Sequence, residues 1–303
     1  MYDVIIIGGG PAGLTAALYA GRSRFKALLL EKMGLGGQII LTPTIENYPG
    51  FVGGVATSDL ISAMQKQVDE LGVTIKSDEV VSIVGDAYFK VSAREGNYEA
   101  KTVIIATGAF PKKLNIPGEE RLIAKGVSYC GTCDGPLFKN KHVFVIGGGD
   151  KAVEEAIYLT RFAQKVTLIH RRDTLRASKI IQERLFENKK IEVLWSTVPL
   201  EIVGENKVEA IRIKNLKNNE IADASCQGVF VFVGIHPNTE SLGHLIKLDE
   251  QGFILTDEAM KTSVEGIFAA GDCRKKTLAQ VITACGDGAT AAFSVNHYLE
   301  LHK

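Results

Sequence analysis

One pattern occurs twice in this chain: an apolar strand, a glycine-rich turn, a helix and then a second apolar strand. The first copy runs from a strand at 3–7 through the turn 8–13 and a helix over 14–21 to a strand at 27–30. The second runs from a strand at 143–146 through the turn 147–152 and a helical stretch ending by 161 to a strand at 166–169. Because each copy has the order of a βαβ unit, the repeat predicts an α/β fold with two Rossmann-like dinucleotide-binding domains.

Each turn combines small residues in a way that suits a bound pyrophosphate. One glycine permits the tight turn, the next lets the backbone approach the phosphates, and the last allows close packing of helix on strand. The helix start then offers free N–H groups and the positive end of the helix dipole. A glycine-rich corner can also be purely structural, but two copies in the same context favour dinucleotide binding. The expected contacts are Gly8, Gly10, Pro11, Ala12 and Gly13 in the first turn, and Gly147, Gly149, Asp150, Lys151 and Ala152 in the second.

The residues at the end of the second strand of each copy distinguish the two ligands. Glu31 ends the first copy, and a carboxylate there accepts hydrogen bonds from a ribose hydroxyl, as on the adenosine of FAD or NAD. His170 has the same offset in the second copy and is followed by Arg171, Arg172 and Arg176. Guanidinium groups suit the extra 2′-phosphate of NADP, although they also occur at a merely solvated strand end. We therefore expect NADPH on the second copy and an unphosphorylated adenosine, such as that of FAD, on the first.

Two further segments indicate how the domains are connected. Residues 102–111 and 229–237 are each an apolar strand that leaves through glycine and proline, and they flank the second copy. The pattern predicts an NADPH domain, residues 113–242, inserted into an FAD domain formed by residues 1–112 and 243–303. Crossings rich in glycine and proline can act as hinges. Ala106, Thr107 and Gly108 lie in the first exit and are included in the expected flavin site.

An acidic residue follows the apolar strand expected at 266–271. A carboxylate at this strand end, Asp272, suits the ribityl hydroxyls of a flavin. The helix expected over 279–299 would present its N-terminus to the flavin pyrimidine oxygen, where negative charge grows on reduction. Asp272 is equally compatible with a simple N-cap of the following turn.

The chemical centre of the sequence is Cys130-Gly131-Thr132-Cys133-Asp134, which lies in the inserted domain just before its nucleotide strand. Two cysteines at this spacing can form a disulfide that reacts through a thiolate. A zinc site is the alternative, but the other cysteines and the six histidines lack the spacing of the two further ligands that zinc needs. We expect redox use and no metal. Asp134 either exchanges a proton with these sulfurs or is an ordinary turn residue.

Composition excludes several other classes of function. Lys+Arg and Asp+Glu are 35 each, so the formal net charge is zero and no overall field attracts nucleic acid. The chain has no apolar run of the roughly 18 residues that a membrane helix needs, and no basic and apolar leader. Five cysteines in 303 residues do not form the disulfide framework of a secreted domain. We expect a cytoplasmic protein that binds neither nucleic acid nor membrane.

Four motifs in this order closely resemble the bacterial-type, low-molecular-weight thioredoxin reductase family of pyridine nucleotide-disulfide oxidoreductases over essentially the whole chain. They are Gly-x-Gly-x-x-Gly, Cys-Gly-Thr-Cys-Asp-Gly, Gly-Gly-Gly-Asp-Lys-Ala-Val-Glu-Glu-Ala and His-Arg-Arg-Asp-x-x-Arg-Ala. The resemblance implies an electron path from NADPH through FAD to the Cys130–Cys133 disulfide and on to thioredoxin or a similar small disulfide protein. It also implies a homodimer whose inserted domain rotates between half-reactions, with Cys133 nearer the flavin and Asp134 as the acid. The implied flavin contacts are Gly36, Gly37, Gln38, Asn47, Asp272, Gln280 and Val281.

Some residues depart from that family's usual pattern. Gly131 stands where alanine is commoner, and Lys151 replaces a small hydroxyl residue beside the pyrophosphate. An arginine is missing before Gln280, and residues 136–138 lack an aromatic pair that touches thioredoxin. A glutaredoxin-like or peroxiredoxin-linked domain is therefore the alternative partner. A ferredoxin–NADP reductase would have no use for the two cysteines, and a non-enzymatic nucleotide- and zinc-binding sensor would hold no flavin.

Overall fold

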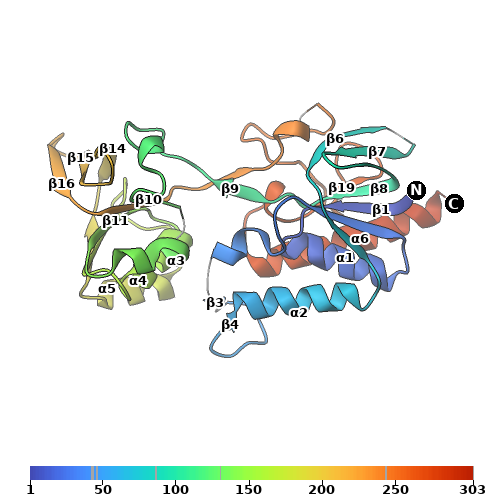
Figure 1. Ribbon diagram of the computed structural model, residues 1–303, viewed down its shortest axis with the longest axis horizontal. Coiled ribbons are helices and arrows are strands. Elements are labelled where there is room, and N and C mark those ends of the chain that lie inside the picture. The colour runs from blue at the N-terminus through green and yellow to red at the C-terminus, as the bar shows by residue number, and fades with distance from the viewer. Residues whose placement is uncertain (42–43, 46, 86, 130, 243, 303) are drawn as a thin grey trace. The chain divides into compact units, whose positions relative to one another are not determined.

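The computed structural model describes residues 1–41, 44–45, 47–85, 87–129, 131–242 and 244–302. The chain forms two compact units, both of which Figure 1 shows. Unit 1 comprises Met1–Phe110 and His236–Lys303, and unit 2 is Pro111–Ile235. The chain thus crosses between the units at 110/111 and 235/236, whereas the sequence placed the boundaries at 112/113 and 242/243.

Unit 1 contains a seven-stranded mixed sheet with the strand order β5-β2-β1-β8-β7-β6, in which β19 also pairs with β8. The strands β5, β2, β1, β8 and β19 run parallel, so that Ile5 lies opposite Leu28 on β2 and Val103 on β8. The strands β6, β7 and the first part of β8 form an antiparallel meander. The elements of unit 1 are β1 (Tyr2–Ile7), α1 (Pro11–Arg22), β2 (Ala27–Glu31), β3 (Thr44–Ile45), β4 (Val55–Ala56), α2 (Thr57–Asp69), β5 (Thr74–Ser77), β6 (Val80–Gly85), β7 (Phe89–Ala93), β8 (Asn97–Ile105), β19 (Ile267–Ala269) and α6 (Val281–Leu301).

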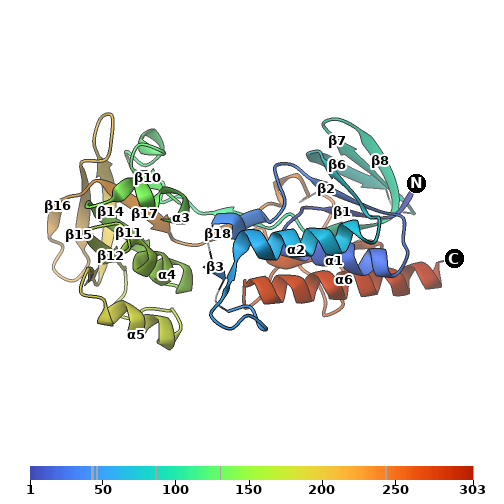
Figure 2. The ribbon, with the colours of Figure 1, turned by 60° about the horizontal axis from the view of Figure 1, so that its bottom comes forward.

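The sheet of unit 1 has a buried core on each face, because successive side chains of a strand point to opposite sides. Val4 and Ile6 belong to the core that includes the helices α1, α2 and α6, which lie along one face (Figures 1 and 2). Ile5 and Ile7 belong to the other core, which is closed by β6, β7 and residues 242–254. The segments Val4–Ile7 and Val103–Ile105 of the central strands are therefore apolar, as expected for parallel strands covered on both faces.

Unit 2 is built on a five-stranded parallel sheet with the order β10-β17-β11-β12-β13. One core of this sheet contains α4 and α5, and the other is closed by the three-stranded antiparallel sheet β14-β15-β16. The elements of unit 2 are β10 (Val127–Ser128), α3 (Gly131–Asp134), β11 (His142–Gly147), α4 (Asp150–Leu159), β12 (Lys165–Ile169), α5 (Lys179–Glu187), β13 (Ile191–Leu194), β14 (Thr197–Val203), β15 (Ala210–Asn215), β16 (Ile221–Ser225) and β17 (Gly228–Phe232). The two crossings, β9 (Ala109–Pro111) and β18 (Ile235–Pro237), pair with each other. In the parts of the chain given above, no helix is both long and apolar enough to traverse a bilayer.

The α/β architecture predicted from the repeat is confirmed, but two local expectations are wrong. The strand expected at 266–271 is only β19, and Asp272 lies in the 3₁₀ turn η5 (Gly271–Cys273) rather than at the strand end. The last helix begins at Val281 instead of residue 279, because Gln280 and Thr283 form a reciprocal capping box there.

Candidate functional site

The first glycine turn joins β1 to α1 and has no room for side chains at its two ends. Gly8 has a φ of +108°, and a Cβ there would lie 2.3 Å from the carbonyl oxygen of Ala106. A Cβ on Gly13 would lie 1.8 Å from the carbonyl oxygen of Gly8. At Gly10, by contrast, no atom would come closer than 4.0 Å. The turn is therefore packed inward, while the backbone before α1 stays accessible to a ligand.

Glu31 holds this turn from the end of β2. Its Oε2 accepts a hydrogen bond from the Gly9 N–H at 2.6 Å, and its Oε1 accepts one from the Met33 N–H at 3.0 Å. Because each carboxylate oxygen can accept more than one hydrogen bond, Glu31 retains capacity for the hydroxyls of a ligand.

The loop after β2 lies against the same turn. The Gly36 N–H donates to the carbonyl oxygen of Gly9 at 2.8 Å, and a Cβ on Gly37 would lie 3.3 Å from the Cα of Gly10. Gln38 follows as an exposed residue of the 3₁₀ helix η1 (Gly37–Leu41). The structure thus brings Gly36 and Gly37 to the first glycine turn, and Gln38 is the next residue of the chain.

The exit of β8 is joined to the second half of unit 1 by Asn238. Thr107 Oγ1 donates to the Asn238 carbonyl at 2.8 Å, and Asn238 Nδ2 donates to the Thr107 carbonyl at 2.9 Å. The Asn238 N–H donates to the carbonyl of Gly108 at 2.9 Å. Cys273 is buried beside this exit, and burial raises the pKa of its thiol to about 11. Cys273 therefore remains a thiol at neutral pH.

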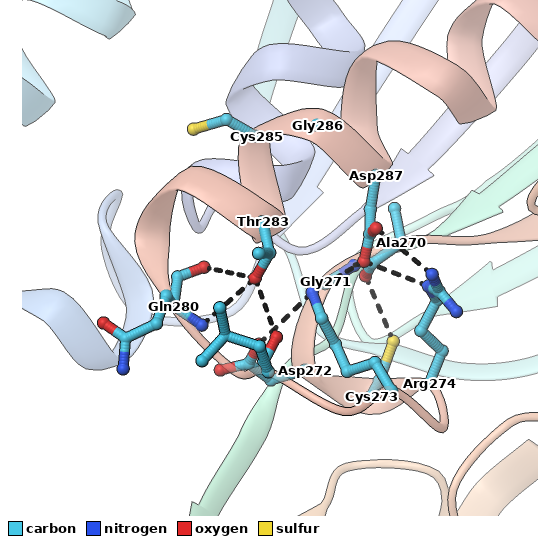
Figure 3. A network of polar contacts seen from close by, with 12 residues as sticks. Ala270, Gly271, Asp272, Cys273, Arg274, Gln280, Thr283, Cys285, Gly286 and Asp287 are labelled. Atoms are coloured by element: carbon cyan, nitrogen blue, oxygen red, sulfur yellow. Dashed lines mark hydrogen bonds and ion pairs between the residues drawn. The ribbon is translucent and has the colours of Figure 1, made fainter. Parts of the chain in front are cut away.

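Asp272 has an incompletely satisfied carboxylate within the network that Figure 3 shows. Its Oδ1 is buried and makes no hydrogen bond to any described residue, while the ammonium of Lys276 is 3.9 Å away. Burial raises the pKa of Asp272, to which Asp287 adds and which Lys276 opposes. A buried acceptor without a donor costs about 1–3 kcal/mol, so Asp272 is suited to the hydroxyl of a ligand.

Asp287 of α6 fixes the turn that carries Asp272. Its carboxylate accepts hydrogen bonds from the Gly271 N–H at 3.1 Å and from Lys276 Nζ at 2.8 Å. The guanidinium of Arg274 donates to both of its oxygens, at 3.0 and 3.2 Å (Figure 3). The sequence analysis missed this network. The sequence held one signal for it, because Asp287 lies among the small residues of the first part of the last helix. A charged side chain that is buried there needs a partner of opposite charge.

The N-terminus of α6 is completed by a residue from the first half of the chain. Asn47 Nδ2 donates to Gln280 Oε1 at 3.0 Å, across 233 positions of sequence. Gln280 caps the helix, whose first residue is Val281. The three residues expected near the flavin in these segments therefore lie together.

The residues of unit 1 fit a flavin dinucleotide. The buried Asp272 oxygen lacks a donor, the Gly10 backbone is open at the start of α1, and Glu31 keeps acceptor capacity. A phosphate at a helix N-terminus, a ribose on a carboxylate and a hydroxylated chain on a second carboxylate match these three features.

Unit 2 repeats the turn between β11 and α4 with different contacts. A Cβ on Gly147 would lie 2.5 Å from the carbonyl oxygen of Phe232, while at Gly149 nothing would lie within 4 Å. Ala152 occupies the position that Gly13 has in the first turn. Asp150 Oδ1 accepts a hydrogen bond from the Ser178 N–H at 2.6 Å. The turn again leaves the backbone before the helix accessible at Gly149, now beside the charged side chain of Lys151.

At the end of β12, His170 and the arginines have different environments. The ring of His170 is buried below Gly148, where an added Cβ would lie 2.3 Å from it. Burial lowers the pKa of His170, and the nearby Arg176 and Arg172 add to that effect, so the ring is neutral. Arg171, Arg172 and Arg176 are exposed. The structure therefore offers the exposed arginines, rather than the buried His170 ring, to a 2′-phosphate, which they fit by charge.

The cysteine motif is described only in part. Cys130 and the side chain of Cys133 lie outside the described residues, whereas Gly131–Asp134 forms the short helix α3, which packs on α4. Asp134 is half-buried at the end of α3. Cys226 is a buried free thiol, and burial raises its pKa to about 12. Within the described ranges, no three His, Cys, Asp or Glu side chains are grouped so that they could hold a metal ion.

Comparisons with known proteins extend over the whole chain. Residues 2–288 match the family described as pyridine nucleotide-disulphide oxidoreductase. Thioredoxin reductase of Peptoclostridium litorale is 49% identical over 307 residues, with 99% of this chain and 98% of that protein covered. Thioredoxin reductase of Bacillus subtilis is 45% identical over 302 residues, with 99% of this chain and 95% of that protein covered. The crystal structure of Lactococcus lactis thioredoxin reductase in the FR conformation has a TM-score of 0.97 and 46% identity, and it covers 99% of this chain and 100% of that one.

Proposed function

We propose that this chain, which belongs to the thioredoxin reductases of the pyridine nucleotide-disulphide oxidoreductase family, uses NADPH and FAD to reduce the Cys130–Cys133 disulfide and then thioredoxin. One observation carries the choice of cofactors: two similar glycine turns end in unlike groups, Glu31 in unit 1 and three exposed arginines in unit 2. FAD supplies the chemistry that side chains lack, because it accepts a hydride and gives electrons to a disulfide.

Unit 1 would hold FAD through the groups that its fold gathers. The open backbone at Gly10 and the start of α1 would receive the pyrophosphate, and Glu31 would accept the ribose hydroxyls. Asp272 would accept from the ribityl chain, while Asn47 and Gln280 would lie at the helix start nearest the flavin ring. Of the side-chain groups in these roles, the Asp272 oxygen is the one that lacks a donor among the described residues, while Glu31 keeps acceptor capacity beside its backbone hydrogen bonds.

Unit 2 would hold NADPH and carry out the thiol chemistry. The turn at Gly149 and Lys151 would receive the pyrophosphate, and Arg171, Arg172 and Arg176 would recognise the 2′-phosphate. Reduction of a disulfide to two thiols consumes a proton in addition to the hydride, and Asp134 adjoins Cys133 as the acid that delivers it. Thioredoxin would then exchange its disulfide with the reduced pair.

We further propose that unit 2 rotates between half-reactions. The nucleotide turn and the cysteine motif belong to the same compact unit, so both cannot address one flavin face at once. The chain enters and leaves this unit through two short segments, β9 and β18, which are suited to act as a hinge. Crosslinking unit 1 to unit 2 in one orientation should stop thioredoxin turnover while permitting at most one half-reaction. Full activity of the locked enzyme would instead support access to opposite flavin faces.

A homodimer in the cytoplasm completes the proposal. Large apolar side chains remain exposed on the paired helices α1 and α6, with Tyr19 44% and Phe293 71% exposed. A second copy covering this face would bury them. In the cytoplasm a Cys-x-x-Cys pair is kept available for catalysis. Sedimentation analysis of the wild type and of Phe293→Glu tests the dimer: the variant should sediment as a monomer.

The central experiment separates flavin chemistry from thiol chemistry. Cys133→Ser should keep FAD bound and reducible by NADPH but lose thioredoxin reduction, because exchange needs both sulfurs. Cys226→Ser, at a buried thiol of the same unit, is the matched control and should retain turnover. Visible spectra, metal analysis and rates with NADPH and NADH provide the measurements. Thioredoxin turnover in Cys133→Ser, or bound zinc without flavin, would contradict the proposal.

A further inference from the structure

A buried carboxylate lies between the nucleotide turn and the cysteine motif of unit 2. Glu155 is on α4, its side chain is only 3% exposed, and its Oε2 has no hydrogen-bond partner among the described residues. Burial raises the pKa of Glu155, while Lys151 and the main-chain amide of Gly131 oppose that effect. Val153 and Ala156, its neighbours on α4, belong to the apolar core of unit 2. Such a group is sensitive to any change in its cationic partner.

That partner is a lysine at the nucleotide turn. Lys151 is the second residue of α4, directly after the turn 147–149, and its Nζ is 2.5 Å from Glu155 Oε1. The Lys151 side chain is 47% exposed and lies at the start of α4, where the pyrophosphate is expected. An ammonium on a flexible stem can reach either anion.

The other side of Glu155 faces the cysteine motif. Gly131, the first residue of α3, has its Cα directly against this carboxylate, since an added Cβ would lie 2.0 Å from Glu155 Oε2. Asp134 is the titratable group that the described part of α3 contributes, and Lys151 is the charged group paired with Glu155 on α4. A change of charge at Glu155 therefore changes the electrostatic environment next to the cysteine motif.

We propose that Lys151 is shared between Glu155 and the nucleotide phosphates, so that binding of NADP(H) draws the ammonium to the phosphates and Glu155 takes up a proton from solvent. The carboxylate becomes a neutral carboxylic acid, no covalent bond other than O–H forms, and the buried site never holds an uncompensated charge. Because the overall reaction of NADPH with a disulfide consumes one proton, this step stores a proton beside the motif when reductant arrives. The inference rests on the proposed NADPH site at the turn 147–149.

The test is calorimetric titration of the FAD-containing full-length enzyme with NADP⁺ in buffers of different ionisation enthalpy. The 2′-phosphate titrates near pH 6 (about the second pKa of a phosphate monoester), so the readout is the difference between wild type and variant. Wild type should take up as much as about one proton more per bound nucleotide than Glu155→Gln. Glu154→Gln, an exposed neighbour on the same helix, is the matched control and should behave as wild type.

Two further variants keep the proposal testable if Glu155→Gln does not fold. Lys151→Thr should bind NADP⁺ about tenfold more weakly and without the extra proton, because its Glu155 is already protonated. Lys151→Arg should retain the uptake. Difference infrared spectra should show a carboxylic acid C=O band that appears on NADP⁺ binding in wild type and is already present in Lys151→Thr without nucleotide.

Negative outcomes fall into two kinds with different meanings. If NADP⁺ binds and wild type shows neither extra proton uptake nor the carboxylic acid band, the shared-lysine proposal is wrong while the NADPH site stands. The same holds if Glu155→Gln takes up as many protons as wild type. If NADP⁺ does not bind the holoenzyme at all, the proposed function itself fails.

Discussion

The two glycine turns of this molecule have similar backbone packing but different side chains around them. In each turn, the first glycine lies against a carbonyl oxygen at the end of the neighbouring strand. Gly8 lies against Ala106, and Gly147 lies against Phe232. In each, the third glycine is open at the start of a helix. The glycines therefore account for the shape of the phosphate site, and they do not distinguish one dinucleotide from another.

The ligand is distinguished by the side chains around that shared shape. In unit 1 the strand end is a carboxylate bonded to the middle glycine, whereas in unit 2 it is a buried neutral histidine below the middle glycine, with arginines outside. The helix start is apolar in unit 1, with Pro11 and Ala12, and charged in unit 2, with Asp150 and Lys151. One backbone frame can thus suit two different nucleotides, because its polar surroundings are independent of its glycines.

The largest expected effect concerns Gly13, where the first turn has no room for a Cβ, whereas the second turn has Ala152 at the corresponding position. Gly13→Ala places a Cβ 1.8 Å from a backbone oxygen, so the turn must move, and we expect a loss of about 3 kcal/mol in unfolding free energy together with weaker FAD retention. Gly149→Ala, which meets nothing within 4 Å, is the control and should change stability by less than about 0.5 kcal/mol. Chemical unfolding and flavin release measure both. Equal losses in the two variants would mean that the close approach of Gly13 to the Gly8 carbonyl oxygen does not account for the cost.

The next effect concerns the choice of nucleotide. Arg171→Gln and Arg172→Gln should each weaken NADPH by about 1.5–3 kcal/mol, the range for a hydrogen bond to a charged group, and leave NADH nearly unchanged. KM values for both nucleotides provide the measurement. Parallel losses for NADPH and NADH would assign these arginines to structure rather than to the 2′-phosphate.

A smaller effect is expected at Asp272, which unit 2 does not duplicate. Its pKa is raised above the ordinary value of 3.8, so the folded apoprotein binds its proton more tightly than the unfolded chain does. This group therefore makes the unfolding free energy fall as pH rises from 3.8 through the raised pKa. FAD affinity should change in the opposite sense and increase with pH, because the ionised carboxylate is the better acceptor.

Asp272→Asn should remove both slopes and weaken FAD about tenfold, which is about 1.4 kcal/mol. Apoprotein unfolding and FAD titration across this pH range supply the data. An unchanged FAD affinity with an unchanged pH slope would show that Asp272 only caps its turn.

The sequence allowed prediction of what depends on local pattern. Both βαβ units, their glycine turns and the membership of the family followed from residues close together in the chain, and the fold and the family are confirmed. The elements that cover the faces of the sheets could not be predicted from the sequence. The strands β14, β15 and β16, for example, are short, and their pairing is defined only in the folded core. The compact units divide at 110/111 and 235/236, a few residues before the boundaries that the sequence predicts.

The candidate site shows the same division. Glu31 and the arginines were identified from their offset to the glycines. The support of Asp272 by Asp287, and the pairing of Asn47 with Gln280, join segments that no periodicity connects. Glu155 was part of a quoted motif, yet only the fold reveals that it lies below Gly131. These long-range polar contacts could therefore be identified only from the structure, because the groups need partners only once folding buries them.

The smallest expected effect tests how tightly the cysteine motif of unit 2 is packed on α4, a contact without counterpart in unit 1. Gly131→Ala would place a Cβ 2.0 Å from Glu155 Oε2, the end of a side chain that can move only by straining its pair with Lys151. We expect a loss of about 1 kcal/mol in unfolding free energy. In a Glu155→Ala background the same change should cost almost nothing, which gives a coupling of about 0.5–1 kcal/mol in a double-mutant cycle. Gly286→Ala, inside α6 with nothing within 4 Å, is the control and should be neutral or stabilising by up to about 1 kcal/mol. A Gly131→Ala loss that is equal with and without Glu155 would place the strain elsewhere in α3 and separate the motif from this carboxylate.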